Sequence, residues 1–436
     1  MQASLETLGQ LERRLNIAVP VADIDSEVHN RLVRLTRTVK MHGFRPGKIP
    51  LKVVVQQYGG QVRQEVIGDT LQKAFGEAVR DNNLKVAGYP KFDPKPLADD
   101  AAQFECSATF EVYPEVALGD LSAATVTRPE VTVGDAEVDE TVDIMRKQRA
   151  TYADVERAAQ DGDRVTLDYH GTIDGKPFAG GHAHDQAVTL GEGRLLPDFE
   201  AQITGMKADD HKQFELRFPE DYHAKETAGK TATFEVTVKG VAEPQLPEVD
   251  ADFARTLGVE DGDISHMRTE IKANVEREAQ RRMNARIKDQ VMQVLLDTTG
   301  IEVPKSLVDM EADRMAHAAR HDLAARGVKV DDKMQIPSEV FTEQAQRRVT
   351  LGLILGEAVR AHSLQAKPEQ VRALVEEQAQ SYEHPAEVIK WFYQSRERLG
   401  EIESLVLENN VVEWVLSQVK IENKPIAFGE LMGNQS

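Results

Sequence analysis

One short segment of the sequence concentrates groups that could bind anions. Residues 43–50 are Gly-Phe-Arg-Pro-Gly-Lys-Ile-Pro, and two glycines and two prolines fix a loop by backbone geometry. Arg45 offers a planar fork for phosphate oxygens, and Lys48 offers a compact positive charge. Phe44 is a large apolar group at an expected tip, typical of a surface that a partner covers. The segment predicts a docking tip for a phosphate-rich surface, and an ordinary Gly/Pro turn beside a solvated basic helix remains the alternative.

The charge distribution supports the docking hypothesis. The chain of 436 residues holds 53 Lys and Arg against 73 Asp and Glu, a net charge of −20, which alone argues against a nucleic-acid partner. Residues 1–112 instead hold 15 basic and 14 acidic residues, a net of +1, so the rest carries −21. Residues 28–64 contain eight basic residues and no acidic one. The basic residues that recur every third position and form a drifting stripe on a helix are Arg31, Arg34, Arg37 and Lys40.

A second set of residues is aromatic and aliphatic rather than charged. It lies within residues 162–240, where apolar and polar residues alternate in three runs separated by Gly/Pro turns, as in a compact, mostly β domain. Taken one at a time, its members could equally form the core of such a domain. They are Tyr169, Phe178, Leu195, Leu196, Phe199, Tyr222 and Phe234.

Other candidate motifs predict no chemistry. His182, His184 and Asp185 have the spacing of metal ligands, but no cysteine or further histidine group supports them, so a solvated loop is favoured. A Gly-Glu-Gly run lacks the later glycine of a phosphate loop. The single cysteine, Cys106, cannot form an internal disulfide, which suits a reducing cytosol. Its alternating surroundings indicate a buried small hydrophobe.

The elements expected around the basic loop form an α+β unit. Expected strands cover residues 1–19 and 103–113, and expected helices cover residues 22–41 and 51–82. Asp23 or Asp25 is the expected cap of the first helix, and Gly59–Gly60 is expected to interrupt the second. Pro114 and Pro129 bracket an extended connector, which a short helix over 134–149 follows.

The last third of the sequence predicts helices without a fixed repeat or a long heptad seam. They cover residues 264–298, 304–326, 337–364, 367–382 and 385–419. Seven of the 11 methionines lie here, and flexible thioethers suit surfaces that bind many apolar sequences, although core filling explains any single one. They are Met267, Met283, Met292, Met310, Met315, Met334 and Met432. Trp391, Phe392 and Tyr393 are adjacent, so they cannot all share one helix face.

The basic loop resembles the Gly-Phe-Arg-x-Gly-Lys-x-Pro signature of the trigger factor family, and the likeness extends over the whole chain in the same domain order. In that family the loop contacts the large ribosomal subunit at the exit of the nascent-chain tunnel. The resemblance therefore implies ribosome binding by this loop, with Phe44, Arg45 and Lys48 as the docking groups. The residues carried over as the ribosome-binding segment are Gly43, Phe44, Arg45, Pro46, Gly47, Lys48, Ile49 and Pro50.

The β domain resembles the FKBP type of prolyl isomerase in three runs: residues 165–178, 190–200 and 218–236. In that family a half-wrapped sheet encloses an apolar pocket with one helix as its floor, so the resemblance implies that the seven aromatic and aliphatic residues line it. Two positions depart from the family pattern. Ala179 stands where an Asp often follows the Phe, and residues 186–188 do not supply the expected aromatic.

These observations predict a multidomain α+β protein without metal, nucleotide or other cofactor. Residues 1–112 form an α+β ribosome-docking domain, 113–149 a connector whose helix packs toward the helical body, 150–243 an FKBP-like β domain with one short helix, and 244–436 an all-α chaperone domain. The expected function is to bind and shield nascent chains and to isomerise X–Pro bonds. The expected partners are the large ribosomal subunit, through protein and rRNA, and unfolded polypeptides, with a homodimer away from the ribosome left open.

Three rival functions remain at this point. One is a free-standing isomerase whose helices only supply substrate affinity. Another is a general holdase with an idle β domain, and a third is an rRNA-binding assembly factor, which the acidic remainder disfavours. The first residues contain no apolar stretch with a secretory cleavage site, and no window approaches the roughly 20 apolar residues of a membrane span. A cytoplasmic location is therefore expected.

Overall fold

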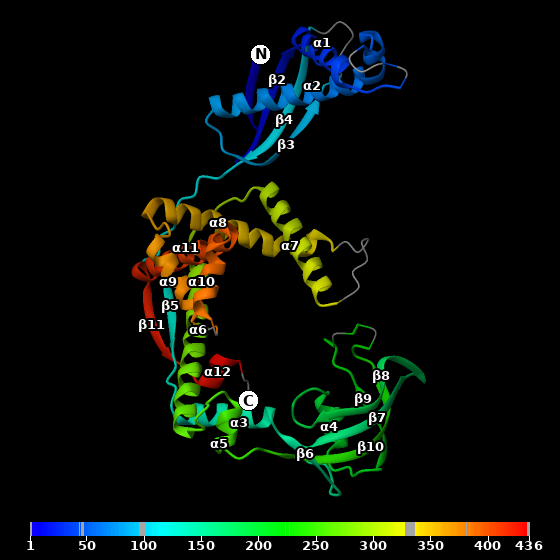
Figure 1. The fold of residues 1–436 in the computed structure, drawn as a ribbon, viewed down its shortest axis with the longest axis vertical. Coiled ribbons are helices and arrows are strands. Elements are labelled where there is room, and N and C mark those ends of the chain that lie inside the picture. The colour runs from blue at the N-terminus through cyan, green and yellow to red at the C-terminus, as the bar shows by residue number, and fades with distance from the viewer. Residues whose placement is uncertain are drawn as a thin grey trace. The chain divides into compact units, whose positions relative to one another are not determined.

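The computed structural model describes residues 2–42, 44, 48–95, 102–222, 224–225, 227–327, 336–380, 382 and 384–433. Contacts divide the chain into two units, each built from distant parts of the sequence. The first unit joins residues 1–128 to 285–423, and the second joins 129–284 to 424–436. Figure 1 shows the elements of both units. Among the helices described, none is long and apolar enough to cross a bilayer.

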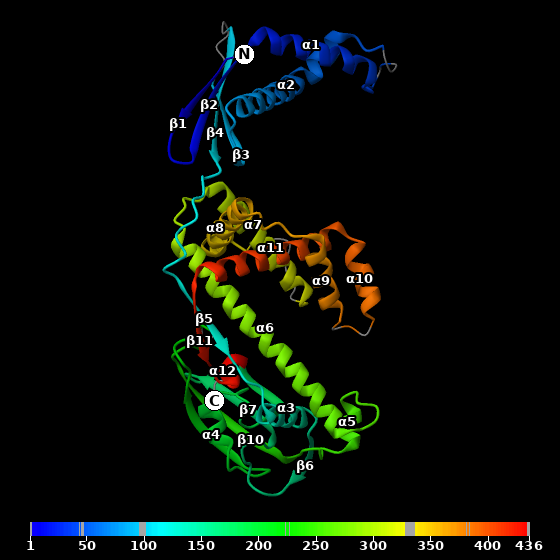
Figure 2. The ribbon, with the colours of Figure 1, turned by 90° about the vertical axis from the view of Figure 1, so that its left-hand side faces the viewer.

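The N-terminal part of the first unit is an antiparallel sheet covered by two helices (Figure 2). The order of its strands is β1-β2-β4-β3. Every second residue is buried from Leu15 onward in β2 and along the whole of β4, so both strands turn one apolar face toward the helices. The elements are β1 (Gln2–Thr7), β2 (Glu12–Pro20), α1 (Val21–Thr38), α2 (Leu51–Asp81), β3 (Val86–Pro94) and β4 (Gln103–Val112).

Two predictions about these helices are wrong. The first helix begins directly after Pro20 and has no side-chain cap, so neither Asp23 nor Asp25 caps it. The second helix runs through Gly59–Gly60 without interruption. Each glycine costs about 1 kcal/mol relative to alanine. The buried residues on both sides, Val54 and Val62 among them, stabilise the helix enough to offset that cost.

The helical part of the first unit surrounds the second half of α6 (Ile264–Thr298). Its largest apolar cluster joins α6 to α8 and α11 through Val291, Ile354 and Val411, which are all fully buried. A single helix over 385–419 was expected, but the chain breaks at Gln394–Ser395, where Ser395 accepts a hydrogen bond from the Arg398 N–H at 3.4 Å. The other elements are α7 (Lys305–Ala325), η1 (Ser338–Phe341), α8 (Thr342–His362), α9 (Pro368–Ala379), α10 (Pro385–Tyr393) and α11 (Arg396–Gln418).

The second unit packs short helices against the first half of α6. Val138 and Val142 of α3 meet Phe253 of α5 and Met267 and Ile271 of α6 in one buried cluster. A two-stranded sheet pairs β5 with β11, and the boundary between the two units falls within both strands. The sequence did not predict β11, because every residue in it is exposed. These elements are β5 (Thr125–Glu130), α3 (Asp135–Gln148), α5 (Ala251–Thr256), β11 (Lys420–Pro425) and α12 (Phe428–Met432).

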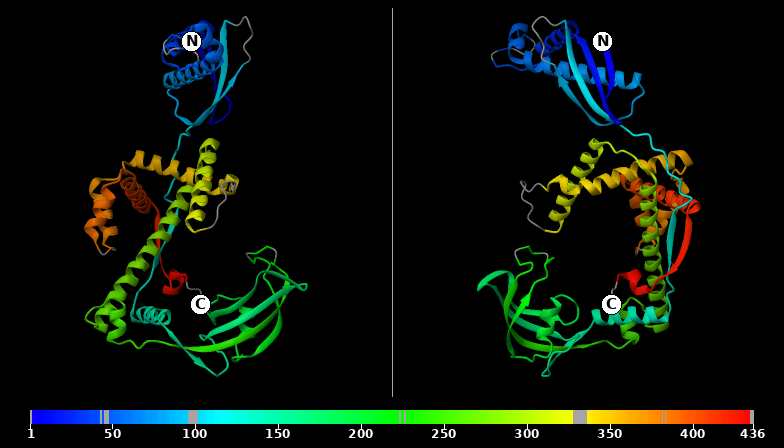
Figure 3. Two further views of the ribbon diagram at one scale, coloured as in Figure 1. Left: turned by 45° about the vertical axis from the view of Figure 1, so that its right-hand side comes forward. Right: turned by 180° about the vertical axis from the view of Figure 1, so that it is seen from behind.

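The same unit holds the predicted β domain, which Figure 3 shows from two sides. Its sheet has the order β6-β10-β7-β8, and β9 also pairs with β10. All of these pairings are antiparallel. A single short helix, α4, packs on the sheet. The elements are β6 (Thr151–Val155), β7 (Arg164–Ile173), β8 (Lys176–Thr189), α4 (Pro197–Ile203), β9 (His211–Arg217) and β10 (Thr231–Gln245).

Candidate functional site

An apolar cavity of about 260 Å³ opens between the sheet of the β domain and α4. All seven aromatic and aliphatic residues selected from the sequence line it, although they come from three strands, one helix and two loops. The further lining residues, which the sequence analysis did not select, are Ala179, Gly180, Arg194, Leu216, Phe218, Ala224 and Thr227. Leu216 and Phe218 could have been found, because residues 214–218 form one of the three alternating runs of the β domain and both are apolar members of it.

The strands bring Tyr169 and Phe234 to the same wall. Phe234 of β10 lies opposite Gly171 of β7 in the strand register. A Cβ atom at Gly171 would stand only 2.5 Å from Cε1 of Phe234, so the ring occupies the space of the missing side chain. The rings of Tyr169 and Phe234 then meet edge to face at 6.1 Å. Gly171 is therefore required for this wall to form.

The floor of the cavity is Phe199 on α4. Pro197 begins this helix, where its fixed φ suits the first turn and its missing N–H costs nothing. The Phe199 side chain is only 5% exposed. Its ring lies edge to face with the rings of Tyr169 at 5.8 Å, Phe214 at 5.3 Å and Phe234 at 5.1 Å. Such pairs hold the floor in one position, which preorganises the cavity before a ligand enters.

Two loops complete the rim. In the first loop, Gly191 and Gly193 both have a positive φ, which glycine adopts without strain. The Gly191 N–H donates to the Glu200 carboxylate of α4 at 3.2 Å. This hydrogen bond ties α4 to the loop that carries Leu195 and Leu196. The second loop carries Tyr222 and closes through the Phe218 N–H and the Lys230 carbonyl at 2.9 Å.

Electrostatically the cavity is poor in charge. Burial, and to a smaller extent the neighbouring Tyr222, raise the pKa of Tyr169, so its hydroxyl stays protonated at neutral pH. Asp168, the preceding residue, has a pKa of about 2, because it accepts a hydrogen bond from the Asp185 N–H at 2.7 Å and pairs with Lys239 at 2.9 Å. Arg194 is the one charged residue among those described around the cavity. The site therefore offers shape, apolar surface and hydroxyl groups.

The three residues with the spacing of metal ligands do not lie in a loop, as the sequence analysis expected. His182, His184 and Asp185 lie on β8 and not in a loop. His184 contacts the Asp168 carboxylate at 3.4 Å, and Asp185 pairs with Lys239 at 2.7 Å. Within the described residues no three His, Cys, Asp or Glu side chains are grouped so that they could hold a metal ion.

Only part of the basic loop can be placed. Gly43, Arg45, Pro46 and Gly47 lie outside the described residues. Phe44 is 39% exposed and its N–H donates to the Met41 carbonyl at 3.1 Å, while Lys48 and Pro50 are exposed. Ile49 is 5% exposed and belongs to the core beneath the loop, so it anchors the loop and presents no side chain to a partner.

The predicted basic stripe on α1 is shorter than expected. Arg31 pairs with Asp69 of α2 at 2.8 Å and with Glu27 at 3.2 Å, so its charge is compensated inside the protein. Arg34, Arg37 and Lys40 are exposed. Two exposed cations therefore remain on α1, which ends at Thr38, and Lys40 follows in the segment that leads to the loop.

The methionine and aromatic residues of the helical region are buried at some positions and exposed at others. Met267 and Met292 are buried in helical cores, as the core-filling alternative predicts, whereas Met310 is 46% exposed. Met283, Met315 and Met432 are half-buried, and Met334 lies outside the described residues. The prediction for the three adjacent aromatic residues is confirmed. Phe392 packs into a core cluster, while Trp391 is 50% exposed and Tyr393 49% exposed.

Comparisons with known families agree with the order of the domains. Residues 1–145 match the family model described as bacterial trigger factor protein, and residues 263–417 match the model of the C-terminus of the same protein. Between them, residues 155–239 match the model of FKBP-type peptidyl-prolyl cis-trans isomerase, which contains the whole cavity.

Full-length relatives give the same result. The trigger factor of Nitrosospira multiformis is 57% identical over 434 residues, covering 99% of this chain and 100% of the relative. That of Laribacter hongkongensis is 55% identical over 435 residues and covers 100% of both chains. A solved structure described as "Promiscuous Substrate Recognition in Folding and Assembly Activities of the Trigger Factor Chaperone" covers 96% of this chain at 19% identity, with a TM-score of 0.47.

Proposed function

This chain belongs to the bacterial trigger factor family, a family of chaperones with an FKBP-type isomerase domain, and from that premise we propose how its parts divide the work. Residues 1–112 dock on the large ribosomal subunit at the tunnel exit, 113–149 connect, 150–243 isomerise X–Pro bonds and 244–436 bind emerging polypeptide. In this proposal the protein acts in the cytoplasm. A free-standing isomerase is not favoured, because the family models match both the N-terminal and the C-terminal regions around the isomerase.

The cavity carries the isomerase proposal. An amide resists rotation by roughly 18–20 kcal/mol because planarity preserves its resonance, and an X–Pro bond exchanges only over tens to hundreds of seconds. The planar amide is more charge-separated than the twisted transition state. An apolar enclosure that excludes water therefore favours the twisted form. This chemistry needs no acid, base or nucleophile, which agrees with a lining made of aromatic and aliphatic side chains.

We assign the seven residues named from the sequence to substrate contact. Phe199 forms the floor on which the proline ring packs. Tyr169, Phe178 and Phe234 form the aromatic wall, and Leu195, Leu196 and Tyr222 form the rim. The edge-to-face contacts of Phe199 with Tyr169 and Phe234 support this assignment, because they fix the wall at right angles to the floor.

The docking assignment rests on the loop between α1 and α2. Phe44 and Lys48 are exposed, while Ile49 anchors the loop in the core. Arg34 and Arg37 on α1 and Lys40 just after it add three exposed cations before the loop. In this proposal Arg45 and Lys48 bind phosphate or acidic groups of the ribosome, and Phe44 packs against an apolar patch there.

Cosedimentation with large ribosomal subunits tests the proposal. Wild type is expected to pellet with the subunits, and a variant with Phe44, Arg45 and Lys48 all changed to Ala is expected to stay in the supernatant. A matched control changes Arg80 and Lys85, two exposed cations elsewhere in the same domain, to Ala and should pellet normally. Equal binding of wild type and the loop variant would remove the docking assignment while leaving the isomerase assignment intact.

A further inference from the structure

Glu111, near the end of β4, binds the first turn of α7, which lies more than 190 residues away in the sequence. The Glu111 carboxylate accepts hydrogen bonds from the backbone N–H groups of Lys305 at 3.0 Å and Ser306 at 2.7 Å. Pro304 precedes this helix without a side-chain cap of its own, and the first N–H groups of a helix have no acceptor within it. Glu111 therefore supplies the missing cap, and its negative charge suits the positive end of the helix dipole.

A second contact holds the same turn from the neighbouring strand. The Ser306 hydroxyl donates to the Ala87 carbonyl at 3.1 Å. Gly88 follows with a φ of +73°, where the register of β3 against β4 shifts. A Cβ atom at Gly88 would lie 2.6 Å from Cβ of Ser306, so only glycine permits this approach. The bulge and the helix start therefore fit each other closely.

The connector that leaves β4 holds the other side of the α6–α7 corner. The Gly119 N–H donates to the hydroxyl of Thr299 at 3.2 Å, and Thr299 is 2% exposed. A Cβ atom at Gly119 would stand only 2.0 Å from the carbonyl oxygen of Thr298. The corner between α6 and α7 is thus held at both ends by residues only eight positions apart in the sequence, Glu111 and Gly119.

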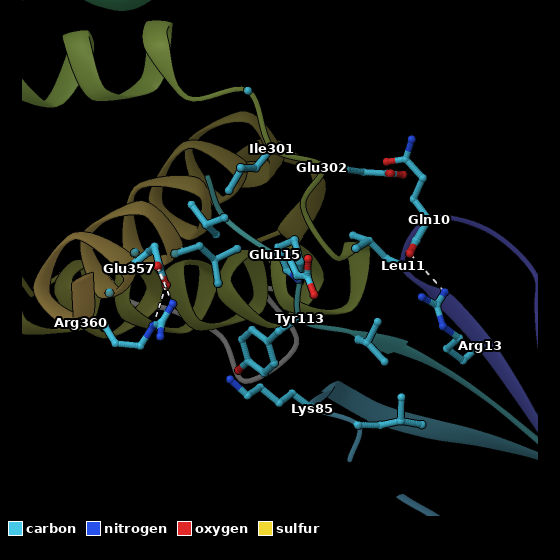
Figure 4. Close-up of a pocket in the computed structure, with 18 of the residues that line it drawn as sticks. Gln10, Leu11, Arg13, Lys85, Tyr113, Glu115, Ile301, Glu302, Glu357 and Arg360 are labelled. Atoms are coloured by element: carbon cyan, nitrogen blue, oxygen red, sulfur yellow. Dashed lines mark hydrogen bonds and ion pairs between the residues drawn. The ribbon is translucent and has the colours of Figure 1, made fainter. Parts of the chain in front are cut away.

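Apolar packing contributes little to this junction. The buried apolar cluster of the N-terminal sheet and those of the helices are separate among the described residues. Between them lies a cavity of about 1230 Å³, which Figure 4 shows with Lys85 and Tyr113 on one side and the Glu357–Arg360 ion pair on α8. Gly352 and Gly356 of α8 also line it and leave open space where side chains would stand. Hydrogen bonds therefore carry most of the contact.

We propose that Glu111 is a latch that sets the orientation of the N-terminal sheet relative to the first helical arm, α7. When the hydrogen bonds of Glu111 to α7 are formed, the N-terminal sheet contacts the α6–α7 corner beside the cavity. When these hydrogen bonds break, the sheet can rotate about the connector, because the cavity leaves space for the movement. The latch is polar and small, so a minor open population exists at equilibrium and a partner that binds one arrangement better can shift it. This proposal does not depend on ribosome docking.

Distance measurements between spin labels in the full chain test the latch. Labels are attached at Lys73→Cys on α2 and His317→Cys on α7, both exposed sites, and Cys106 stays in place because it is 1% exposed. Glu111→Gln removes the charge and replaces one of the two accepting oxygens by an NH2 group, which cannot accept from an N–H. Gly88→Ala adds the clashing Cβ. Glu105→Gln is the matched control, because Glu105 lies on the same face of β4 and pairs with Lys95 instead.

Wild type and Glu105→Gln are expected to give one narrow distance distribution. In Glu111→Gln and Gly88→Ala the population at other distances should rise about ten-fold. Hydrogen exchange should speed up at Lys305 and Ser306 alone, while exchange in β2 and β4 shows that the sheet is still folded. A wild-type distribution that is already broad, a Glu111→Gln distribution equal to wild type, or equal broadening in Glu105→Gln would each overturn the proposal.

Discussion

Arg157 holds the buried carboxylate of Asp163 with both of its terminal nitrogens, at 2.5 and 2.9 Å. The carboxylate is 3% exposed, and it also accepts the Gln160 N–H at 2.8 Å. Arg157 in turn contacts Glu243 of β10 at 3.2 Å, so the pair ties the segment between β6 and β7 to the long strand at the centre of the isomerase sheet. The cavity residues on β7 and β10 depend on that frame.

The pair predicts acid sensitivity of the isomerase domain. The Arg157 hydrogen bonds lower the pKa of Asp163, more than burial raises it. A carboxyl whose folded pKa is depressed stabilises the fold above its unfolded pKa, about 3.9, and this contribution is lost as pH falls through the folded value. The protection factors for hydrogen exchange in β7 and β10 of the full chain should therefore fall below about pH 4 in wild type, and Asp163→Asn should lack this component of the pH dependence.

Removing the Arg157 side chain should lower the stability of the β domain more than removing an exposed charge does. Arg157→Ala leaves a buried carboxylate without its main partner, and we expect a loss of roughly 2–3 kcal/mol of local stability at neutral pH, since Arg157 is itself partly exposed. Glu215→Gln, a change at an exposed carboxylate on β9, should change local stability by less than about 0.5 kcal/mol. Similar exchange rates in the two variants would show that the pair does not brace the sheet.

Phe199 should be necessary for the isomerase reaction. Phe199→Ala removes the floor but costs about 3–5 kcal/mol of packing and could unfold the domain, so Phe199→Leu is the more informative change. Because leucine cannot keep the three edge-to-face ring contacts, we expect kcat/KM on a proline peptide to fall at least about ten-fold, or 1.4 kcal/mol. Catalysis of proline-limited refolding should fall in parallel.

The control for that change is Phe253→Leu. Phe253 is 3% exposed and is also packed in an apolar core, but it lies on α5 outside the cavity. It should leave kcat/KM unchanged. If Phe199→Leu is folded and as active as this control, the floor of the cavity is not needed for the reaction and the assignment of the cavity as the reaction site is wrong.

The sequence predicted the cavity better than it predicted the contacts around it. Tyr169, Phe199 and Phe234 were identifiable because their order and spacing match an isomerase pattern. Thr227 was missed because its burial depends on a loop whose turn it helps to close, by a hydrogen bond to the Ala224 carbonyl at 3.0 Å. A lone threonine in a polar segment carries no periodic signal.

The remaining misses have the same physical origin. β11 has no buried residue, so no alternation marks it, and its pairing with β5 joins residues almost 300 positions apart. The break at Ser395 interrupts a run whose composition favours helix throughout, and only the packing of α9, α10 and α11 decides it. Glu111 looks like any strand glutamate until α7 is placed against it. Long-range partners decide each of these cases, and one sequence does not reveal them.

Cys106 gives a direct probe of the N-terminal domain. Its side chain lies on the helix-covered face of β4 and is 1% exposed, as the sequence predicted, and burial raises the pKa of its thiol. Both effects suppress the reactive thiolate. We expect a disulfide reagent at pH 8 to react at least about a thousand-fold more slowly with Cys106 in the folded chain than in urea, because reaction requires opening of the core.

A Cys106→Ala, Ser122→Cys variant, with the thiol at an exposed site of the connector, should react at similar rates in both conditions. Fast labelling of folded Cys106 would mean that α2 leaves the sheet readily, and the loop proposed for docking would then lack a rigid base.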